Sequence, residues 1–319
     1  MTQFDVFNGD ADGICALHQL RLAEPADDAV LITGIKRDIE LLGRVDAAAG
    51  DRVTVLDVSL DRNRTDLQRL LAAGARVFYV DHHYAGDIPA HAALETLIDT
   101  APDSCTSLLV DAHLQGRYRA WAVAAAFGDN LHERARLAAE PLGVGARGLE
   151  TLQALGTYIN YNGYGTALDD LFFHPAELYR RLRPYADPFR FVAEDEAYRI
   201  LADGYAGDMD RARAVAPERA TPHGAIYVLP DTHWARRVSG VFANELAREH
   251  PARAHALLTR RPQGGYVVSV RAPLQRQDGA DALCRRFPTG GGRKAAAGIN
   301  NLPEDRFDAF AAAFVDGFR

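Results

Sequence analysis

Three short apolar runs near the start of the chain each end in acidic or histidine residues. Residues 4–7 lead to Asp10, residues 52–56 lead to Asp57, and residues 76–80 lead to Asp81. Runs of this length, rich in β-branched and aromatic residues, favour strands. Helical patterns lie between them, and such alternation predicts a largely parallel sheet with helices on both faces.

The polar residues that follow these runs predict a metal site. A single Asp after a strand is usually a turn residue or a helix cap, and a single His is usually structural. Here, however, they recur at three equivalent strand ends, and ligands of parallel sheets gather at the carboxyl edge. The residues expected to meet there are Asp10, Asp12, Asp57, Asp81, His82 and His83. Their chemistry favours a metal-dependent phosphoesterase.

The first part of the chain is expected to form one α/β domain over residues 1–213. The predicted strands are 4–9, 29–35, 52–57, 76–80 and 95–98, and the predicted helices are 13–23, 38–48, 61–73 and 104–115. A buried helix over 120–131 ends in Gly128-Asp129-Asn130, and a helical portion follows from about residue 132. Tyr158 to Tyr164 is read as a polar aromatic turn of unassigned role.

Residues 214–222, which contain two prolines, are the predicted linker to a second, smaller α/β domain over 223–319. The patterns there predict strands at 225–229, 255–259 and 266–271, helices at 236–249 and 280–287, and a final helix from about 304. Gly290, Gly291 and Gly292 predict a turn whose backbone comes close to an anion.

Charge restricts the class of partner. The chain of 319 residues has a net charge of −7, whereas proteins that hold long nucleic acids usually present a basic field. Residues 260–294 are a local exception, with eight basic and two acidic residues around the glycines. Lysine occurs only at Lys36 and Lys294, so 34 of the 36 basic residues are arginine. We read this preference mainly as a coding bias.

Three widely spaced cysteines form no Cys-x-x-Cys pair, which argues against a disulfide framework and a zinc ribbon. No apolar run approaches the length of a membrane span. We therefore expect a cytoplasmic enzyme without a membrane partner.

Together these motifs resemble the DHH phosphoesterase superfamily over nearly the whole chain. Asp10-Ala-Asp12-Gly13 is similar to its first motif, Asp57 to its second, Asp81-His82-His83 to its third, and Asp129 to the aspartate of its fourth. The glycine-rich segment from Gly290 resembles the DHH-associated domain of RecJ and the nano-RNases, and Ser269-Val-Arg271 resembles the strand before it. The resemblance implies an active site in the cleft between the two domains.

The resemblance also implies a site with two Mn²⁺ ions, for which Mg²⁺ or Co²⁺ could substitute. Asp10 would hold one ion, Asp12, His82 and Asp129 would hold the other, and Asp57 would bridge them. Asp81 would orient a histidine, and His83 would face the scissile phosphate, so that Asp57, Asp81 and His83 form the catalytic set. The substrate-binding residues would be Arg271, Gly290, Gly291, Gly292, Arg293 and Lys294.

Three positions depart from the family pattern. Val6 stands where a metal-binding His is frequent, and Asn8 stands where RecJ-type members have Asp, so Asn8 is a further candidate ligand. Arg293 stands where His usually follows the three glycines, and its guanidinium can still bind a phosphate in bidentate fashion. These departures leave the first metal and the substrate open.

The expected reaction is hydrolysis of phosphate esters in short oligonucleotides, dinucleotides or small nucleotide phosphates. The negative net charge and the absence of length for an OB domain argue against a RecJ-like exonuclease specific for single strands, which is the alternative. A protein of another class, a catalytically weakened nucleotide-binding sensor, is the second alternative. A homodimer is compatible with either.

Overall fold

The computed structural model describes residues 1–319 as two compact units, Met1–Asp203 and Gly204–Arg319. The division falls inside helix α9 (Glu196–Arg213), before the predicted linker at 214–222. Within that linker, Arg219–Ala220 form strand β6 and pair with the next strand, so part of the predicted linker belongs to the second sheet. Each unit has its own sheet, as expected, and we describe each by itself.

The first sheet is parallel and has the strand order β2-β1-β3-β4-β5. Its strands are β1 (Gln3–Phe7), β2 (Val30–Ile32), β3 (Arg52–Leu56), β4 (Arg76–Asp81) and β5 (Leu94–Ile98). All five predicted strands are therefore confirmed, although β2 is shorter than expected. The chain moves from β1 outward to β2 and then crosses back to β3. The strand order thus reverses between β1 and β3, which is where open α/β sheets bind ligands.

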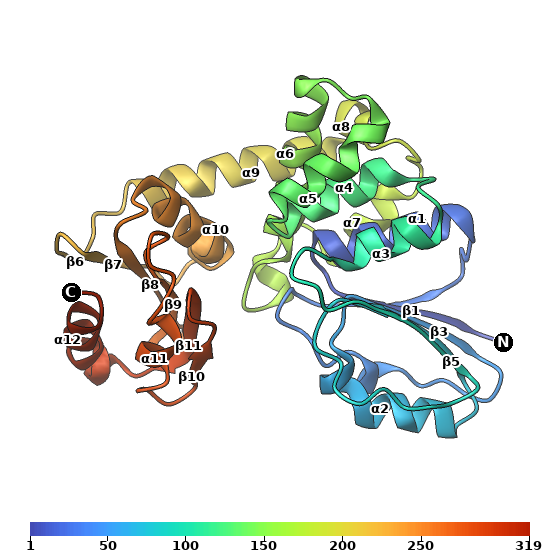
Figure 1. The fold of residues 1–319 in the computed structure, drawn as a ribbon, viewed down its shortest axis with the longest axis horizontal. Coiled ribbons are helices and arrows are strands. Elements are labelled where there is room, and N and C mark those ends of the chain that lie inside the picture. The colour runs from blue at the N-terminus through green and yellow to red at the C-terminus, as the bar shows by residue number, and fades with distance from the viewer. The chain divides into compact units, whose positions relative to one another are not determined.

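Helices cover both faces of this sheet (Figure 1). On one face lie α1 (Ala11–Ala23) and α3 (Thr106–His113), and on the other lies α2 (Leu60–Ala72). The remaining helices pack mainly on α1 and on one another: α4 (Arg119–Gly128), α5 (His132–Ala139), α6 (Ala146–Gly163), α7 (Pro175–Leu182) and α8 (Pro188–Glu194). Alternate strand residues face opposite sides. Phe7, Leu56 and Val80 pack under α1 and α4, whereas Val55 and Tyr79 pack toward α2. This alternation builds two cores.

The predicted helix over 38–48 is wrong, because only one 3₁₀ turn, η1 (Leu42–Arg44), forms there. Gly43 lowers the helix propensity of this segment. The side chain of Asn63 on α2 accepts a hydrogen bond from the Leu42 N–H and donates one to the Ile39 carbonyl. These two backbone groups therefore bond to a side chain instead of to a helix.

Close packing places α6 against α4. A Cβ atom on Gly156 would lie 1.8 Å from the carbonyl oxygen of Ala124, so only glycine fits at this crossing. The segment from Tyr158 to Tyr164, read as a turn, is instead the last part of α6 and its cap residue. Its Asn160 is thereby brought to the carboxyl edge of the first sheet, where it bonds to Lys36.

The second unit contains a mixed sheet with the order β10-β11-β9-β8-β7-β6. After β6, its strands and helices are β7 (Gly224–Leu229), α10 (His233–Glu249), β8 (Ala254–Arg260), β9 (Tyr266–Arg271), α11 (Ala280–Cys284), β10 (Gly290–Gly292), β11 (Ala296–Leu302), a 3₁₀ turn η4 (Glu304–Arg306) and α12 (Phe307–Gly317). The smaller α/β domain is thus confirmed.

The three consecutive glycines do not form the predicted turn. They form the short strand β10, which pairs antiparallel with β11, and the tight connection lies over residues 293–295. A Cβ on Gly290 would lie 1.9 Å from the Cys284 carbonyl oxygen, and Gly292 has a φ of +137°. Gly290 is therefore needed for close packing against α11, and Gly292 for the backbone conformation and the close contact with Ala297 of β11, whereas a side chain at Gly291 would meet no neighbour.

Candidate metal centre

Asp10 is the N-cap of α1, at the carboxyl edge of the first sheet. Its Oδ1 accepts hydrogen bonds from the backbone N–H groups of Asp12 at 2.9 Å and Gly13 at 3.1 Å. This N-cap ends the loop after β1 and fixes the carboxylate at the edge. Burial by itself would raise the pKa of Asp10, but the nearby ammonium of Lys36 more than offsets burial and lowers it.

Asp12 is held by a second helix. Its two carboxylate oxygens accept hydrogen bonds from the N–H groups of Thr106 and Ser107, each at 2.7 Å, at the start of α3. The amino end of a helix favours a carboxylate. Even so, burial and the charge of Asp129 raise the pKa of Asp12. Thr106 and Ser107 were not among the predicted site residues; the signal that could have found them was the Ser/Thr-rich start of the predicted helix.

Asp57 directly follows β3 and has a φ of +59°, in the left-handed region. Non-glycine residues occupy that region rarely, and aspartate and asparagine are among those that tolerate it. The unusual backbone directs a carboxylate that is only 2% exposed into the cluster. Burial, reinforced by the charges of Asp10 and Asp12, raises the pKa of Asp57 well above its usual range.

Asp81 ends β4 and orients the two histidines that follow. Its Oδ1 accepts hydrogen bonds from the His82 N–H at 2.9 Å and from Nδ1 of His83 at 2.7 Å. Burial would lower the pKa of His83, but this bond and the Asp81 charge raise it. The bond to Asp81 engages Nδ1 of the His83 ring, so Nε2 is the ring nitrogen left for another partner.

His82 lies at the centre of the carboxylates. Its Nε2 is 3.4 Å from Asp57 Oδ1, 3.7 Å from Asp129 Oδ2 and 3.9 Å from Asp12 Oδ2. Ligands bound to an ion at about 2.1 Å lie roughly 3 to 4 Å from one another, so these separations suit a shared cation. Two overlapping groups could hold one: Asp12, His82 and Asp129, and Asp57, His82 and His83.

The donor types fit a divalent metal. Mixed carboxylate and imidazole ligands suit Mn²⁺ or a similar ion better than a metal that prefers thiolates. In addition, Oδ2 of Asp81 is buried without a hydrogen-bond partner. Several buried carboxylates facing one another are costly unless a cation neutralises them. The residues present therefore fit a metal ion.

Lys36, which was not among the predicted site residues, is the cation that the structure places in this cluster. Its ammonium donates to Asp10 Oδ2, to Asp129 Oδ1 at 3.2 Å and to Asn160 Oδ1 at 3.0 Å. Burial would lower the pKa of Lys36, but the carboxylates of Asp10 and Asp129 raise it well above its usual value. Lys36 is therefore charged.

Asn8, a candidate ligand, bonds to the backbone. Its Oδ1 accepts from the Asp10 N–H at 3.2 Å, and its Nδ2 donates to the Lys36 carbonyl at 3.2 Å. Asn8 thus ties the loop after β1 to the loop that carries Lys36.

The predicted substrate-binding residues gather at one end of the second sheet. Arg271 pairs with Ala296 in register, directly beside the connection that carries Arg293 and Lys294. The Arg271 guanidinium donates to Asn244 Oδ1 at 2.7 Å and to Ser269 Oγ at 2.9 Å, which holds it in one orientation.

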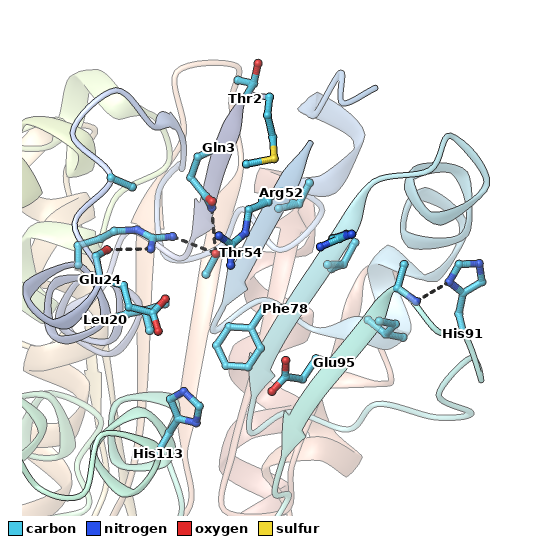
Figure 2. Close-up of a pocket in the computed structure, with 18 of the residues that line it drawn as sticks. Thr2, Gln3, Leu20, Glu24, Arg52, Thr54, Phe78, His91, Glu95 and His113 are labelled. Atoms are coloured by element: carbon cyan, nitrogen blue, oxygen red, sulfur yellow. Dashed lines mark hydrogen bonds between the residues drawn. The ribbon is translucent and has the colours of Figure 1, made fainter. Parts of the chain in front are cut away.

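A separate hollow of 860 Å³ lies at the opposite, amino edge of the first sheet (Figure 2). Gln3, Arg52 and Leu94, each at the amino-terminal end of its strand, line it together with Phe78 and His113. None of the predicted site residues is among its lining residues. This hollow is therefore distinct from the candidate metal centre.

The chain matches no family model, and no curated protein matches its sequence. Solved structures do match its fold. Exonuclease RecJ bound to manganese has a TM-score of 0.62 and 20% identity, covering 98% of this chain and 89% of RecJ. RecJ from Thermus thermophilus in complex with Mn²⁺ has a TM-score of 0.64 and 22% identity, covering 98% of this chain and 51% of that protein.

The pGpG-specific phosphodiesterase PggH from Vibrio cholerae has a TM-score of 0.62 and 15% identity, covering 99% of this chain and 98% of PggH. The chain thus has the two-domain fold of RecJ and PggH, which confirms the fold expected from the sequence resemblance. No helix of the structure is both long and apolar enough to cross a membrane.

Proposed function

We propose that this protein is a metal-dependent phosphoesterase of the DHH superfamily that hydrolyses short oligonucleotides, dinucleotides or small nucleotide phosphates. The observation that carries the proposal is the position of His82 Nε2 within 4 Å of Asp12, Asp57 and Asp129. These donors lie where the strand order of a parallel sheet reverses.

The chain's own residues would hold the metal as a buried carboxylate and imidazole set. Asp12, His82 and Asp129 would bind it, and Asp57 would complete the set. A bound divalent ion lowers the pKa of water and stabilises charge on phosphoryl oxygens. Because two of the RecJ structures contain Mn²⁺, we propose Mn²⁺, with Mg²⁺ or Co²⁺ as substitutes.

His83 is proposed to act on the substrate phosphate. Asp81 engages Nδ1, so the ring is fixed with Nε2 as the atom able to donate to a phosphate oxygen. The raised pKa of His83 favours the protonated ring that such a donor needs. Asp81 would therefore act through His83, as a positioning residue.

The second unit is proposed to bind the rest of the substrate. Arg271, Arg293 and Lys294 place three cationic side chains at one end of its sheet. A guanidinium binds phosphate oxygens in bidentate fashion, and the β10–β11 hairpin adds backbone N–H groups. The small number of cations suits a short substrate better than a long strand.

A substrate panel tests the proposal. Metal-stripped protein with added Mn²⁺ would be given a linear dinucleotide, a five-residue RNA, a long single-stranded DNA, 3′-phosphoadenosine 5′-phosphate and pyrophosphate, with products resolved by chromatography. We expect cleavage of the short nucleotide species. Degradation of the long DNA would instead support the exonuclease alternative, and nucleotide binding without turnover on any substrate would support a sensor.

Matched variants assign the activity to this centre. His82→Ala should lose nearly all turnover while keeping the wild-type circular dichroism spectrum, because His82 lies in both candidate metal groups. His91→Ala is the control, since His91 lies on the surface and caps only the backbone of Ala93. Normal rates in His82→Ala would show that the site assignment is wrong.

A further inference from the structure

Lys36 is fixed in the cluster through its backbone as well as its side chain. Its N–H donates to the Gly163 carbonyl at 2.9 Å, and its carbonyl accepts from Asn8 Nδ2 at 3.2 Å. An ammonium has three N–H donors. Three oxygen acceptors surround this one, from Asp10, Asp129 and Asn160, which belong to three different segments. The Tyr164 ring lies 5.8 Å from Nζ and adds a cation–π contact.

These bonds use both oxygens of Asp10. Oδ1 accepts from the N–H groups of Asp12 and Gly13, and Oδ2 accepts from the Lys36 ammonium. The carboxylate that the family resemblance assigns to a first metal ion is therefore already paired with a cation, and Oδ1 is occupied by two N–H groups. An ion that binds Asp10 would have to share Oδ2 with the Lys36 ammonium or displace it.

The remaining donors suffice for one ion. His82 Nε2 belongs to both candidate groups, and one imidazole nitrogen binds one ion at a time. In the group with Asp57 and His83, the nearest atom of His83 is Nδ1, which is already bonded to Asp81. In the group of Asp12, His82 and Asp129, the oxygens of Asp12 accept one backbone N–H each, which leaves each a second lone pair for an ion, and Oδ2 of Asp129 points away from Lys36 toward His82.

Composition supports a specific need for lysine at this position. Only Lys36 and Lys294 are lysines among 36 basic residues, so the chain strongly prefers arginine. A planar guanidinium cannot converge on three oxygens as a compact ammonium does. Of the two cationic side chains, lysine is the closer substitute for a spherical ion.

We propose that the ammonium of Lys36 replaces one of the two metal ions that the family resemblance implies, so that this protein binds one divalent ion through Asp12, His82 and Asp129. Asp129 would then lie between the two cations, with Oδ1 toward Lys36 and Oδ2 toward the metal. The inference rests on the proposed function only in that the centre binds a metal.

Counting ions tests this without substrate. Metal-free full-length protein would be titrated with Mn²⁺ by calorimetry, and the bound ion examined by electron paramagnetic resonance. We expect one Mn²⁺ per chain in the cluster and a spectrum without Mn–Mn coupling. Two tightly bound, magnetically coupled ions in the wild-type protein would overturn the proposal, whatever the variants do.

A pair of lysine variants then locates the effect. Lys36→Met keeps the length of the side chain but frees Asp10, Asp129 and Asn160, so we expect a second Mn²⁺ to bind and a coupled spectrum to appear. Lys294→Met is the matched control, because Lys294 is exposed and 3.7 Å from its nearest acidic partner, Asp278. It should keep one ion.

The two proposals fail in different ways. A folded Lys36→Met protein that still binds a single ion would contradict the role of Lys36. One ion in the wild-type protein together with no hydrolysis would leave Lys36 in its proposed role but contradict the phosphoesterase. Two ions in the wild-type protein together with hydrolysis would support the phosphoesterase but contradict the proposed role of Lys36.

Discussion

His83 and Asp81 form the shortest histidine–carboxylate contact of the candidate centre, with 2.7 Å between Nδ1 and Oδ1. The same Oδ1 accepts the N–H of His82, so a single oxygen atom orients both histidines. Because Asp81 is the last residue of β4 and fully buried, the rigid sheet determines where these rings lie.

Asp81→Asn should lower activity without unfolding the protein. The amide keeps the shape of the side chain but removes the charge that raises the pKa of His83, so that pKa should fall. Loss of such a supporting partner typically costs about 10- to 100-fold in activity or metal affinity. NMR titration of the metal-free protein measures the His83 pKa, with exposed His91 as the internal control. An unchanged His83 pKa would show that Asp81 does not orient it in solution.

Asp57→Asn should abolish turnover yet stabilise the metal-free protein. Burial and the charges of Asp10 and Asp12 disfavour the ionised carboxylate, and asparagine tolerates the left-handed backbone of this position. We expect the metal-free melting temperature to rise by about 2 °C or more, since 1 kcal/mol shifts it by roughly that amount.

The control for this variant is Asp61→Asn on α2, where the carboxylate is 43% exposed and pairs with Arg64 at 3.1 Å. Calorimetry of both metal-free proteins should show a gain for Asp57→Asn and almost no change for the control. A drop in the melting temperature of Asp57→Asn would mean that the cluster does not store charge repulsion.

His18 should make the first unit sensitive to acid. It is buried on α1, its Nε2 lies 2.9 Å from the Tyr185 carbonyl oxygen, and burial lowers its pKa to about 4. The unfolded chain binds a proton near pH 6.5, so stability is complete above that pH and falls as the pH decreases toward 4. The loss from this group is on the order of 3 kcal/mol.

Urea denaturation between pH 4 and 7.5 measures this effect. His18→Gln keeps an amide donor for the Tyr185 carbonyl but cannot titrate, so its stability should depend less on pH over that range. A wild-type and variant pair with the same pH dependence would exclude His18 as the source.

Arg271→Ala should weaken substrate binding more than the chemical step. The guanidinium is held by Asn244 and Ser269 at the end of the sheet that carries Arg293. Losing a charged hydrogen bond costs about 1.5 to 3 kcal/mol, or roughly 10- to 100-fold in KM. Arg260→Ala is the control, because Arg260 pairs with Tyr266 in register at the opposite end of the β8–β9 pair. Equal effects of the two variants on KM would contradict this binding role.

The fold was largely predictable because its signals are local. Apolar runs such as residues 52–56 and 76–80 lie in the sheet as β3 and β4, and strand–helix alternation leaves few arrangements. The wrong predictions arise where tertiary contacts override a local pattern. Residues 38–48 have a helical pattern, but Asn63, distant in sequence, bonds to their backbone.

The site residues also fall into those that local sequence signals predict and those that only tertiary contacts bring together. The acidic and histidine residues at strand ends were predictable because parallel strands share one carboxyl edge. Lys36 and Asn160 were not, since the loop after β2 and the end of α6 meet only in the folded chain. Gly290 to Gly292 misled the prediction because consecutive glycines suit a tight strand contact as well as a turn.

Because the chain has only two lysines, the reactivity of the Lys36 amine can report on the state of the metal centre. Lys294 is 75% exposed, whereas the Lys36 ammonium is engaged by Asp10, Asp129 and Asn160. An acylating reagent needs the free amine, so it should modify Lys294 first. It should spare Lys36 as long as the Lys36 ammonium keeps its bonds to Asp10, Asp129 and Asn160. Peptide mass spectrometry of the labelled protein would then read the state of the carboxylate cluster from a single side chain, with the other lysine as an internal standard.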